Sequence, residues 1–320
     1  PSSNINRYKF NYRIMVTVKL FYHIMPWEID YALLSYTQLK KSKYHLKDDV
    51  KVIIDTHLNL SNYLIDWENT SIPKEHFIKK YQDLSMLLKD YEHNSIIYEG
   101  DENYGLLDMQ KIAYGDDIDY YVPICPDAYF SEYLLTSLIE AARVASNKYV
   151  VITPEIYKMW DWTWDEITNK KYMDVPYEQW DKGDIFDIRN DLKQSEGELS
   201  LDPITKSKWA IWFDIYNKAF YEDLCPVHED WVGYGPWDWY SMMLSENAKS
   251  LGVDFQQYLL RGQTSFEYSI GSLKERGYVG YYRDFFSIKM GVQLQRDAFE
   301  ANMQQYLNKG IQMLKEKNIL

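Results

Sequence analysis

Apolar and β-branched runs divide the first half of the chain into short strands separated by helical segments. Residues 14–24 and 50–54 are rich in Val, Ile and aromatic side chains, which is typical of buried strands. Between these two runs, Ile29, Leu33 and Tyr36 recur at the spacing of one helical face. The pattern therefore predicts strand, helix and strand in that order.

The same alternation continues to about residue 152. It predicts strands at 95–98, 120–124 and 149–152 and helices at 106–114 and 134–145. Strands that alternate with helices are typical of an α/β fold, here a Rossmann-like, mostly parallel sheet flanked by helices.

The second half of the chain is less regular. Residues 155–205 are rich in Trp, Asp and Lys with little periodicity, and they form either a wall of a binding site or an insertion without a ligand role. A strand-like run at 209–216, a helix at 236–248 and an amphipathic C-terminal helix at 292–314 follow. We expect this last helix to pack on the sheet or on a second subunit, so a homo-oligomer is possible.

Composition excludes several classes of protein. The 320 residues are 46% hydrophobic and 26% charged, which is sufficient for a large core. The net charge of −13 argues against a nucleic-acid partner. Cys125 and Cys225 are too few and too far apart to predict a disulfide framework or a zinc site. No apolar stretch approaches ~18 residues, so we expect no membrane span and a cytoplasmic protein.

Tryptophan is unusually frequent for a chain of this size. Most of the 11 Trp residues lie in the second half of the sequence. Their flat amphipathic rings serve either as walls for sugar rings or, more commonly, as hydrophobic anchors in a core. Composition alone does not decide between these two roles of tryptophan.

Polar side chains follow the predicted strands, where ligands of open α/β sheets bind. Asp55 follows the second strand, and Asp101 and Asn103 follow the third. The ends of the first and fourth strands carry the runs Pro26, Trp27, Glu28 and Cys125, Pro126, Asp127. Carboxylates at these ends accept hydrogen bonds from a base or ribose, or hold a cation.

These strand ends resemble those of nucleotide-sugar-dependent glycosyltransferases of the GT-A fold. In that family an Asp-any-Asp motif holds a divalent cation, Mn²⁺ or Mg²⁺, on the donor's diphosphate. Asp127 matches the last carboxylate of the motif, whereas Cys125 stands in place of the first. A literal Asp-any-Asp at Asp117 and Asp119 precedes the predicted strand, and we interpret it as a turn.

A second segment, HEDWVGYGPWDWYSMMLSENAKSLGVDF, resembles the family's Gly-rich aromatic turn followed by a catalytic helix. By this resemblance Asp238 is the catalytic base, Gly233 and Gly235 are the turn glycines, and Gly252 follows the helix. Trp237 replaces a Glu that generally contacts the acceptor. The alternative role for Asp238 is capping of its own helix.

The resemblance, which covers roughly residues 16–254, implies one GT-A-like catalytic domain over residues 1–320. Residues 14–127 would be its nucleotide-sugar-binding half, 128–290 the acceptor half with the insertion at 155–205, and 291–320 the C-terminal helix. The implied donor contacts are Pro26, Trp27, Glu28, Asp55, Asp101, Asn103 and Asp127. The implied acceptor contacts are Tyr234, Trp237, Trp239, Glu229 and Asp230. Asp127 would hold the cation, with His228 as a further candidate ligand; no His follows the Asp-bearing helix to supply one.

The implied function is inverting transfer of a sugar from a nucleotide diphosphate to a hydroxyl group of a glycan or other acceptor. A non-catalytic carbohydrate-binding protein on a degenerate scaffold is the alternative, because Cys125 and Trp237 replace two carboxylates. A nucleotidyltransferase is less favoured, since residues 23–30 contain no Lys, Arg or Gly with which to grip a triphosphate.

Overall fold

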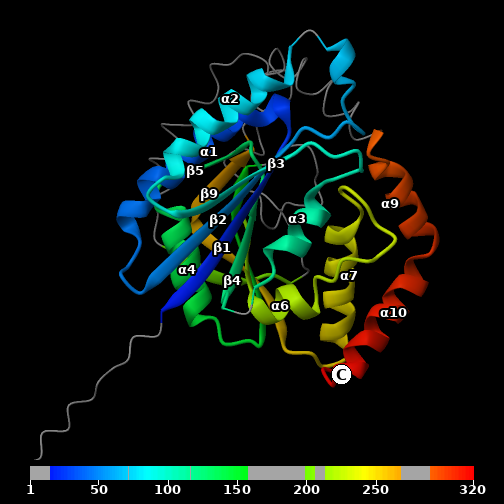
Figure 1. Cartoon of the computed structure of the whole chain (residues 1–320). Helices are drawn as coiled ribbons and strands as arrows, with labels where there is room; N and C mark the ends of the chain where they lie inside the picture. Colours follow the sequence, from blue (N-terminus) through cyan, green and yellow to red (C-terminus); the bar gives the residue numbers. More distant parts are fainter. Residues whose placement is uncertain (1–14, 71, 116, 158–198, 206–212, 268–288) are drawn as a thin grey trace, which may run out of the picture.

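The chain folds into a twisted central sheet with helices on both faces, which confirms the α/β fold class (Figure 1). The computed structural model describes residues 15–70, 72–115, 117–157, 199–205, 213–267 and 289–320. Within these ranges, no helix has both the length and the apolarity needed to cross a bilayer. Most of the Trp-rich segment and residues 206–212 lie outside the described ranges.

Four parallel strands form one half of the sheet, in the order β3, β2, β1, β4. Their bounds are β1 Val16–Ile24, β2 Val50–Asn59, β3 Glu92–Tyr98 and β4 Tyr120–Ile124. The carboxyl ends of β1 and β4 are neighbours, because Tyr22 pairs with Ile124. The residues that follow these two strands therefore meet at one edge of the sheet.

The other half of the sheet is mixed, so the sheet as a whole is mostly but not purely parallel, as expected. Beyond β4, the order continues as β8, β6, β9 and β5, and β7 pairs with β9. Only β6 and β9 are parallel here, whereas β8, β5 and β7 are antiparallel to their neighbours. The bounds are β5 Ala128–Phe130, β6 Tyr149–Tyr157, β7 Ser200–Pro203, β8 Ile215–Asn217 and β9 Phe255–Glu267.

Successive side chains of a strand point to opposite faces of the sheet, and different helices cover each face. In β1, Leu20 and Tyr22 belong to the core under α1 (Ile29–Ser42), α2 (Lys74–Ser85) and α4 (Leu134–Val144). Phe21 belongs to the opposite core, under α3 (Leu106–Ala113), α6 (Lys218–Asp223) and α7 (Trp237–Ser250). Short 3₁₀ helices lie at Pro26–Glu28 (η1), Lys43–His45 (η2), Trp67–Asn69 (η3) and Met86–Leu88 (η4).

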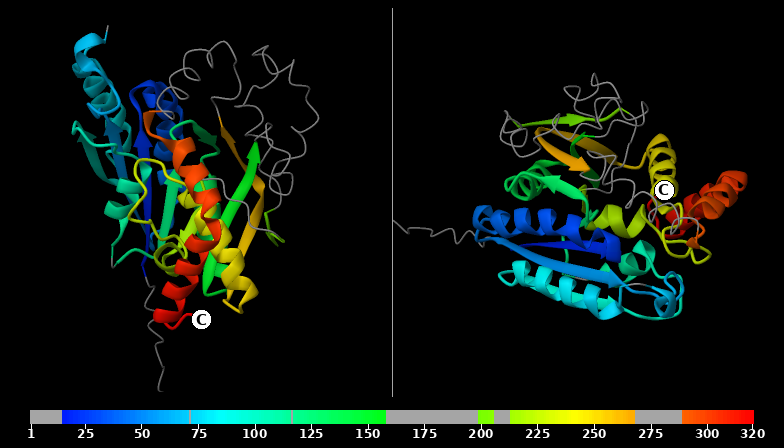
Figure 2. Two further views of the ribbon diagram at one scale, coloured as in Figure 1. Left: turned by 90° about the vertical axis from the view of Figure 1, so that its right-hand side faces the viewer. Right: turned by 90° about the horizontal axis from the view of Figure 1, so that it is seen from above.

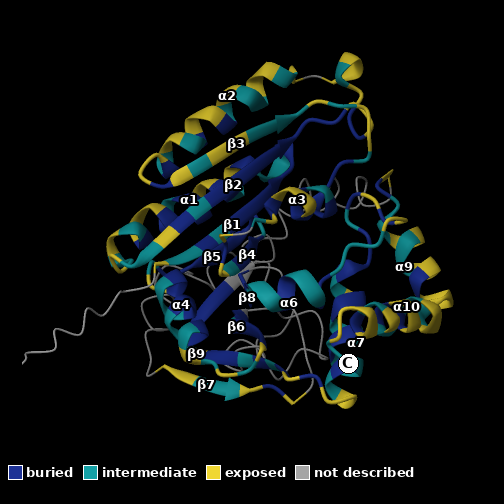
Figure 3. Ribbon diagram, turned by 60° about the horizontal axis from the view of Figure 1, so that its bottom comes forward, coloured by how far each residue is buried: buried dark blue, intermediate teal, exposed yellow. Residues whose placement is uncertain are grey.

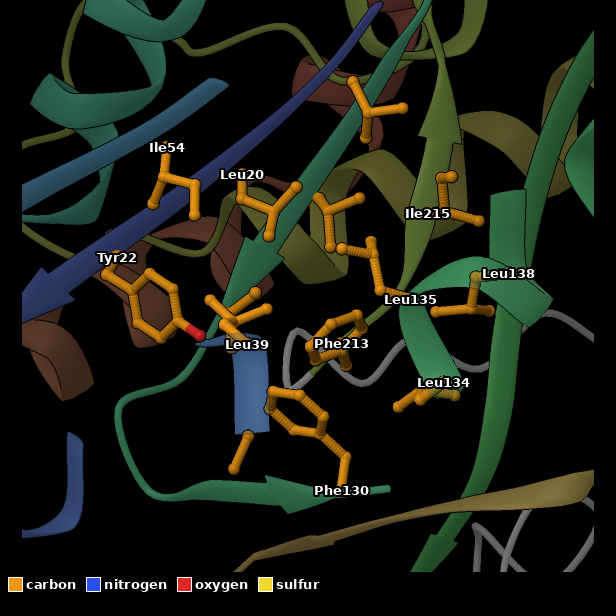
Figure 4. Close-up of a cluster of buried hydrophobic side chains, with 14 of the residues drawn as sticks. Leu20, Tyr22, Leu39, Ile54, Phe130, Leu134, Leu135, Leu138, Phe213 and Ile215 are labelled. Atoms are coloured by element: carbon orange, nitrogen blue, oxygen red, sulfur yellow. The ribbon is translucent and has the colours of Figure 1, made fainter. Parts of the chain in front are cut away.

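The first core is a dry layer of aliphatic and aromatic side chains between the sheet and α1, α2 and α4. Figure 4 shows Leu20 and Ile54 from the sheet, Leu39 from α1 and Phe130 from β5 converging in it. The hydroxyl of Tyr22, which is fully buried, is 2.7 Å from the hydroxyl of Ser35. Burial of this layer fixes the carboxyl ends of β1 and β4 in place.

The C-terminal segment forms two helices, α9 (Val292–Ala301) and α10 (Met303–Glu316), rather than the single helix expected at 292–314. The Asn302 side chain causes the break. Its Nδ2 donates to the Ala298 carbonyl at 2.9 Å, and its backbone amide donates to the Phe299 carbonyl at 3.1 Å. Both helices lie beside α7 in the two views of Figure 2, and Phe299, Leu307 and Leu314 join the α7 core rather than the sheet. Their outer sides are exposed, as are those of α2 (Figure 3).

Strand β2 is longer than the predicted run, so the expectation that Asp55 ends this strand is wrong. Pairing with β1 continues to Leu58, and His57 and Asn59 are fully buried. Four polar residues within 55–59 interrupt the apolar pattern, but buried hydrogen bonds replace their contact with water. The expected strand at 209–216 is observed only as Ile215–Asn217 within the described residues.

Candidate active site

A cavity of about 310 Å³ lies at the carboxyl ends of β1 and β4. It is bounded by the segments after these two strands, by the start of α7 and by the start of α9. Its lining residues are His23, Met25, Trp27, Glu28, Leu106, Pro123, Ile124, Cys125, Pro126, Asp127, Tyr234, Trp237, Asp238, Met290, Val292 and Arg296. Segments separated by more than 250 residues therefore share one site.

The wall after β1 is the turn η1, which carries Trp27 and Glu28. The Glu28 carboxylate folds back and its Oε2 accepts the Met25 backbone amide at 2.9 Å. This hydrogen bond holds the turn closed, and both Trp27 and Glu28 line the cavity. Pro26, which was expected to contact the donor, is buried and does not line the cavity.

The wall after β4 is a tight turn that carries Cys125 and Asp127. The Ala128 amide donates to the Cys125 carbonyl at 3.0 Å, and the chain then enters the short strand β5. Asp127 is 8% exposed, so its carboxylate sits in a nearly closed environment. A buried carboxylate at a strand end requires polar or cationic partners when ionised, which makes this position sensitive to the charge of a ligand.

A glycine turn positions the start of α7 against α3. Gly233 has φ +63°, and its carbonyl accepts the Leu107 amide at 3.0 Å. A Cβ on Gly105 would lie 2.5 Å from the carbonyl carbon of Gly233, so the two backbones are in direct contact. This close approach fixes Tyr234 and Trp237, which follow the turn, on the cavity wall.

Asp238 lies in the first turn of α7 and is not its cap. The N-cap residue is Pro236, and no side-chain hydrogen bond caps the helix. A carboxylate in a first helical turn interacts favourably with the unpaired amides there. Asp238 lines the same cavity as Asp127, although the two are far apart in sequence.

A buried histidine orients Tyr234. The Asn59 amide is fixed because its Oδ1 accepts the Ser61 backbone amide at 3.0 Å, so its Nδ2 must donate to His23 Nε2 at 3.1 Å. The proton of His23 is therefore on Nδ1, which donates to the Tyr234 hydroxyl. Burial, and secondarily the nearby His57, lowers the pKa of His23 to about 3. His23 thus faces the cavity as a neutral ring.

The C-terminal segment supplies the last wall. The Gln295 side chain forms two hydrogen bonds with Val232, accepting its amide and donating to its carbonyl, both at 3.0 Å. The Met290 carbonyl accepts Asn103 Nδ2 at 2.9 Å. These contacts dock α9 on the glycine turn and bring Arg296 to the cavity. The guanidinium carbon of Arg296 is 5.2 Å from the centre of the Trp239 ring.

The expected donor residues of β2 and β3 lie outside the cavity. Asp55 is buried in the sheet, where its Oδ2 is 2.7 Å from Lys19 Nζ. Asp101 accepts a hydrogen bond from Asn62 at 2.8 Å on the surface. Asn103 supports the cavity wall from behind through Met290.

Several of the expected acceptor residues also lie away from the cavity. Glu229, Asp230 and Trp239 are exposed, and none of them lines it. His228 packs against the rings of Trp231 and Tyr306 and is 3.3 Å from the Asp230 carboxylate. Asp119, by contrast, accepts the Thr17 amide at 2.8 Å, which agrees with the interpretation of residues 117–119 as a turn.

The described residues do not build a cation site. No group of three or more His, Cys, Asp or Glu side chains within the described ranges is placed to hold a metal ion. Cys125 lines the cavity beside Asp127, and hard cations prefer oxygen to sulfur. The expected Mn²⁺ or Mg²⁺ therefore does not fit the side chains placed here.

Two features of the site have no clear sequence signal. His23 lies near the end of its strand, and strand alternation places it on the same side as Phe21, which is the one usable clue. Arg296 lies 169 positions after Asp127 on an amphipathic helix. The spacing of apolar residues along this helix does not indicate that Arg296 lines the cavity.

No protein-family model and no curated protein matches the sequence. Among solved structures, the chain is similar to S. aureus TarS 1–349, with 11% identity, 93% of this chain and 72% of that chain covered, and a TM-score of 0.41. The same protein in complex with UDP gives 12% identity over 92% and 71% of the two chains and a TM-score of 0.43. GalNAc-T7 with UDP, GalNAc and Mn²⁺ gives 10% identity over 79% and 43%, with a TM-score of 0.41. Likeness at these identities and TM-scores assigns no function to this chain.

Proposed function

We propose that the protein transfers a sugar from a nucleotide diphosphate donor to a hydroxyl group. The observation that carries the proposal is the convergence of Asp127 and Asp238 on one cavity at the carboxyl ends of parallel strands. Ligands of open α/β sheets bind at this edge, and pockets for small molecules have volumes of about 300–1,000 Å³. The observed cavity lies at the lower end of that range.

The walls of the cavity suit a sugar held between two segments. Trp27 and Trp237 face it from different elements, and Tyr234 is held on it by His23. Aromatic rings pack against the apolar faces of sugars, while hydroxyl and carboxylate groups accept or donate hydrogen bonds at the rim. We assign the β1 and β4 ends to the donor and the α7 turn to the acceptor.

Asp238 is the proposed base. The acceptor oxygen attacks the anomeric carbon, the bond from that carbon to the diphosphate oxygen breaks, and the acceptor proton passes to the Asp238 carboxylate. A single displacement of this kind inverts the anomeric configuration. A positioned carboxylate contributes ~10²–10⁴-fold to such a step.

The first prediction concerns Asp238. Asp238→Asn should lower transfer by ~10²–10⁴-fold, because the amide cannot accept the proton, while nucleotide binding stays within about twofold. UDP and UDP-GlcNAc, which the solved TarS structures contain, are the first compounds to test. Binding is measured by calorimetry, and transfer by mass spectrometry against a panel of glycan acceptors.

Asp297→Asn is the matched control, since Asp297 is an exposed carboxylate on α9 that accepts a hydrogen bond from the Gln293 side chain at 2.7 Å. It should leave both binding and transfer unchanged. Full transfer by Asp238→Asn would exclude Asp238 as the base.

A carbohydrate-binding protein without catalysis is the second candidate. It is favoured by Cys125 at the position of a cation-holding carboxylate and by the lack of a three-ligand metal group in the described ranges. Thermal unfolding in the presence of glycans and of nucleotides separates the two functions. A binder alone would be stabilised by glycans and not by nucleotides, whereas a transferase responds to the nucleotide.

A further inference from the structure

Among the described residues that line the cavity, carboxylates outnumber cations. Three carboxylates line it, those of Glu28, Asp127 and Asp238. Among the described lining residues, Arg296 is the one cation, because His23 is neutral. A diphosphate brings further negative charge, which grows on the leaving oxygen as the anomeric bond breaks, so the site needs positive charge at that point.

Arg296 is held at the cavity without being paired to a carboxylate. Its neighbour Gln295 ties α9 to Val232, and the Trp239 ring lies under one face of the guanidinium. No ion pair joins Arg296 to a described acidic residue, and its Nε is buried without a hydrogen-bond acceptor among the described residues. Arg296 itself is half-buried and lines the cavity.

The contacts of Arg296 with the described residues do not explain its place at the cavity. A cation over an aromatic ring is only weakly stabilised where solvent reaches it, and a buried donor without an acceptor is costly and rare in folded proteins. The Trp239 contact alone thus does not compensate for the unpaired Nε of Arg296.

We propose that Arg296 binds the diphosphate of the nucleotide donor and supplies the positive charge that a divalent cation would otherwise supply in this cavity. This inference rests on the proposed function and deepens it, since it makes donor binding independent of metal. Guanidinium is always protonated and matches phosphate oxygens with two parallel N–H donors. It therefore stabilises the leaving diphosphate without a proton transfer.

The test measures binding of UDP and of inorganic pyrophosphate by calorimetry, in excess EDTA and again with Mn²⁺. The wild-type protein should bind both ligands in EDTA, and Mn²⁺ should change the affinity by less than about threefold. Arg296→Gln should weaken both by roughly 10- to 100-fold, as expected for loss of a hydrogen bond to a charged group. Arg296→Lys keeps the positive charge but not the two parallel N–H donors of the guanidinium, and it should weaken binding by roughly threefold to tenfold.

Lys309→Gln is the matched control, because Lys309 also lies over an aromatic ring, Tyr306, on the C-terminal helices but away from the cavity. It should bind both ligands as the wild type does. Circular dichroism and the thermal midpoint establish that each variant is folded, and if Arg296→Gln does not fold, Arg296→Lys carries the comparison.

Three results would overturn the inference. Unchanged affinity in the folded Arg296 variant would show that the guanidinium does not contact the diphosphate. Binding by the wild type only with Mn²⁺ would show that a cation supplies the charge, and it would leave the proposed transferase function intact. Absence of nucleotide binding under both conditions would remove the inference and the proposed function together.

Discussion

At the residue scale, the candidate site depends on backbone contacts as much as on its charged groups. Tyr234 is aimed by His23, and the turn that carries it is held where Gly233 contacts Gly105. Gly105 has extended backbone angles that any residue can adopt. A glycine at position 105 is thus required by space and not by backbone conformation.

Gly105→Ala should lower the free energy of unfolding by about 1–3 kcal/mol. Its added Cβ would lie 2.5 Å from the Gly233 carbonyl carbon and oxygen, and a backbone cannot rotate away as a side chain can. Gly100→Ala is the control, because its Cβ would lie 2.5 Å from the Tyr98 hydroxyl, the end of a half-buried side chain. Urea unfolding of both variants measures the difference, and equal losses would contradict the explanation.

At the element scale, the contact between α10 and α7 depends on the lack of a side chain at Gly310. A Cβ there would lie 2.5 Å from the Tyr240 hydroxyl oxygen and 2.7 Å from a methyl group of Leu244. Both side chains are buried in the core that α7 shares with the C-terminal helices, so neither can turn outward. Glycine is otherwise unfavourable inside a helix, which indicates that close packing determines the residue here.

Gly310→Ala should destabilise the protein despite the better helix propensity of alanine. The propensity gain is about 1 kcal/mol, whereas overpacking of a buried contact costs about 1–3 kcal/mol, so the expected net loss is up to about 2 kcal/mol. Hydrogen exchange should also accelerate in residues 303–316. Gln305→Ala, at an exposed position of the same helix, should be neutral or slightly stabilising, and a Gly310→Ala variant that behaves likewise would disprove the packing argument.

Sequence patterns predicted elements well where one side of the element is apolar and poorly where polar residues are buried. The strand Tyr120–Ile124 was predicted with its observed bounds. The predicted β2 was too short because His57 and Asn59 are polar and polar residues were taken to end the strand. In the structure, buried partners form hydrogen bonds with both side chains. No element was predicted for residues 74–85, where α2 lies.

The same limit applies to the candidate site. Asp127 was predicted from its place after a strand and Asp238 from a family resemblance, and both line one cavity. Asp55 and Asp101 follow the same local rule but face other partners. Arg296 reaches the cavity because Gln295 docks α9 on Val232, which is a tertiary contact without a local signal.

At the scale of the whole molecule, buried neutral histidines make stability depend on pH. Burial lowers the pKa of His23 to about 3 and that of His57 to about 4, the latter against a partial opposing effect of Asp55. In the unfolded chain both histidines titrate near 6.5. Between these values the unfolded state binds more protons than the folded state, so the free energy of unfolding falls as the pH drops below about 6.5 toward 3.

His57→Gln isolates one of these two contributions from the titration of the carboxylates. Between pH 7 and pH 5, the wild type should lose roughly 2 kcal/mol more of its unfolding free energy than the variant, because the variant has no imidazole to protonate on unfolding. Urea unfolding at pH 7, 6 and 5 measures the two slopes. His57 Nε2 is buried without a partner among the described residues, and Lys19 lies nearby, so a proton at that atom would stay uncompensated in the folded state. Parallel pH profiles for the two proteins would mean that His57 takes up its proton in the folded state as readily as in the unfolded one, and that the sheet opens enough at pH 5 to solvate it.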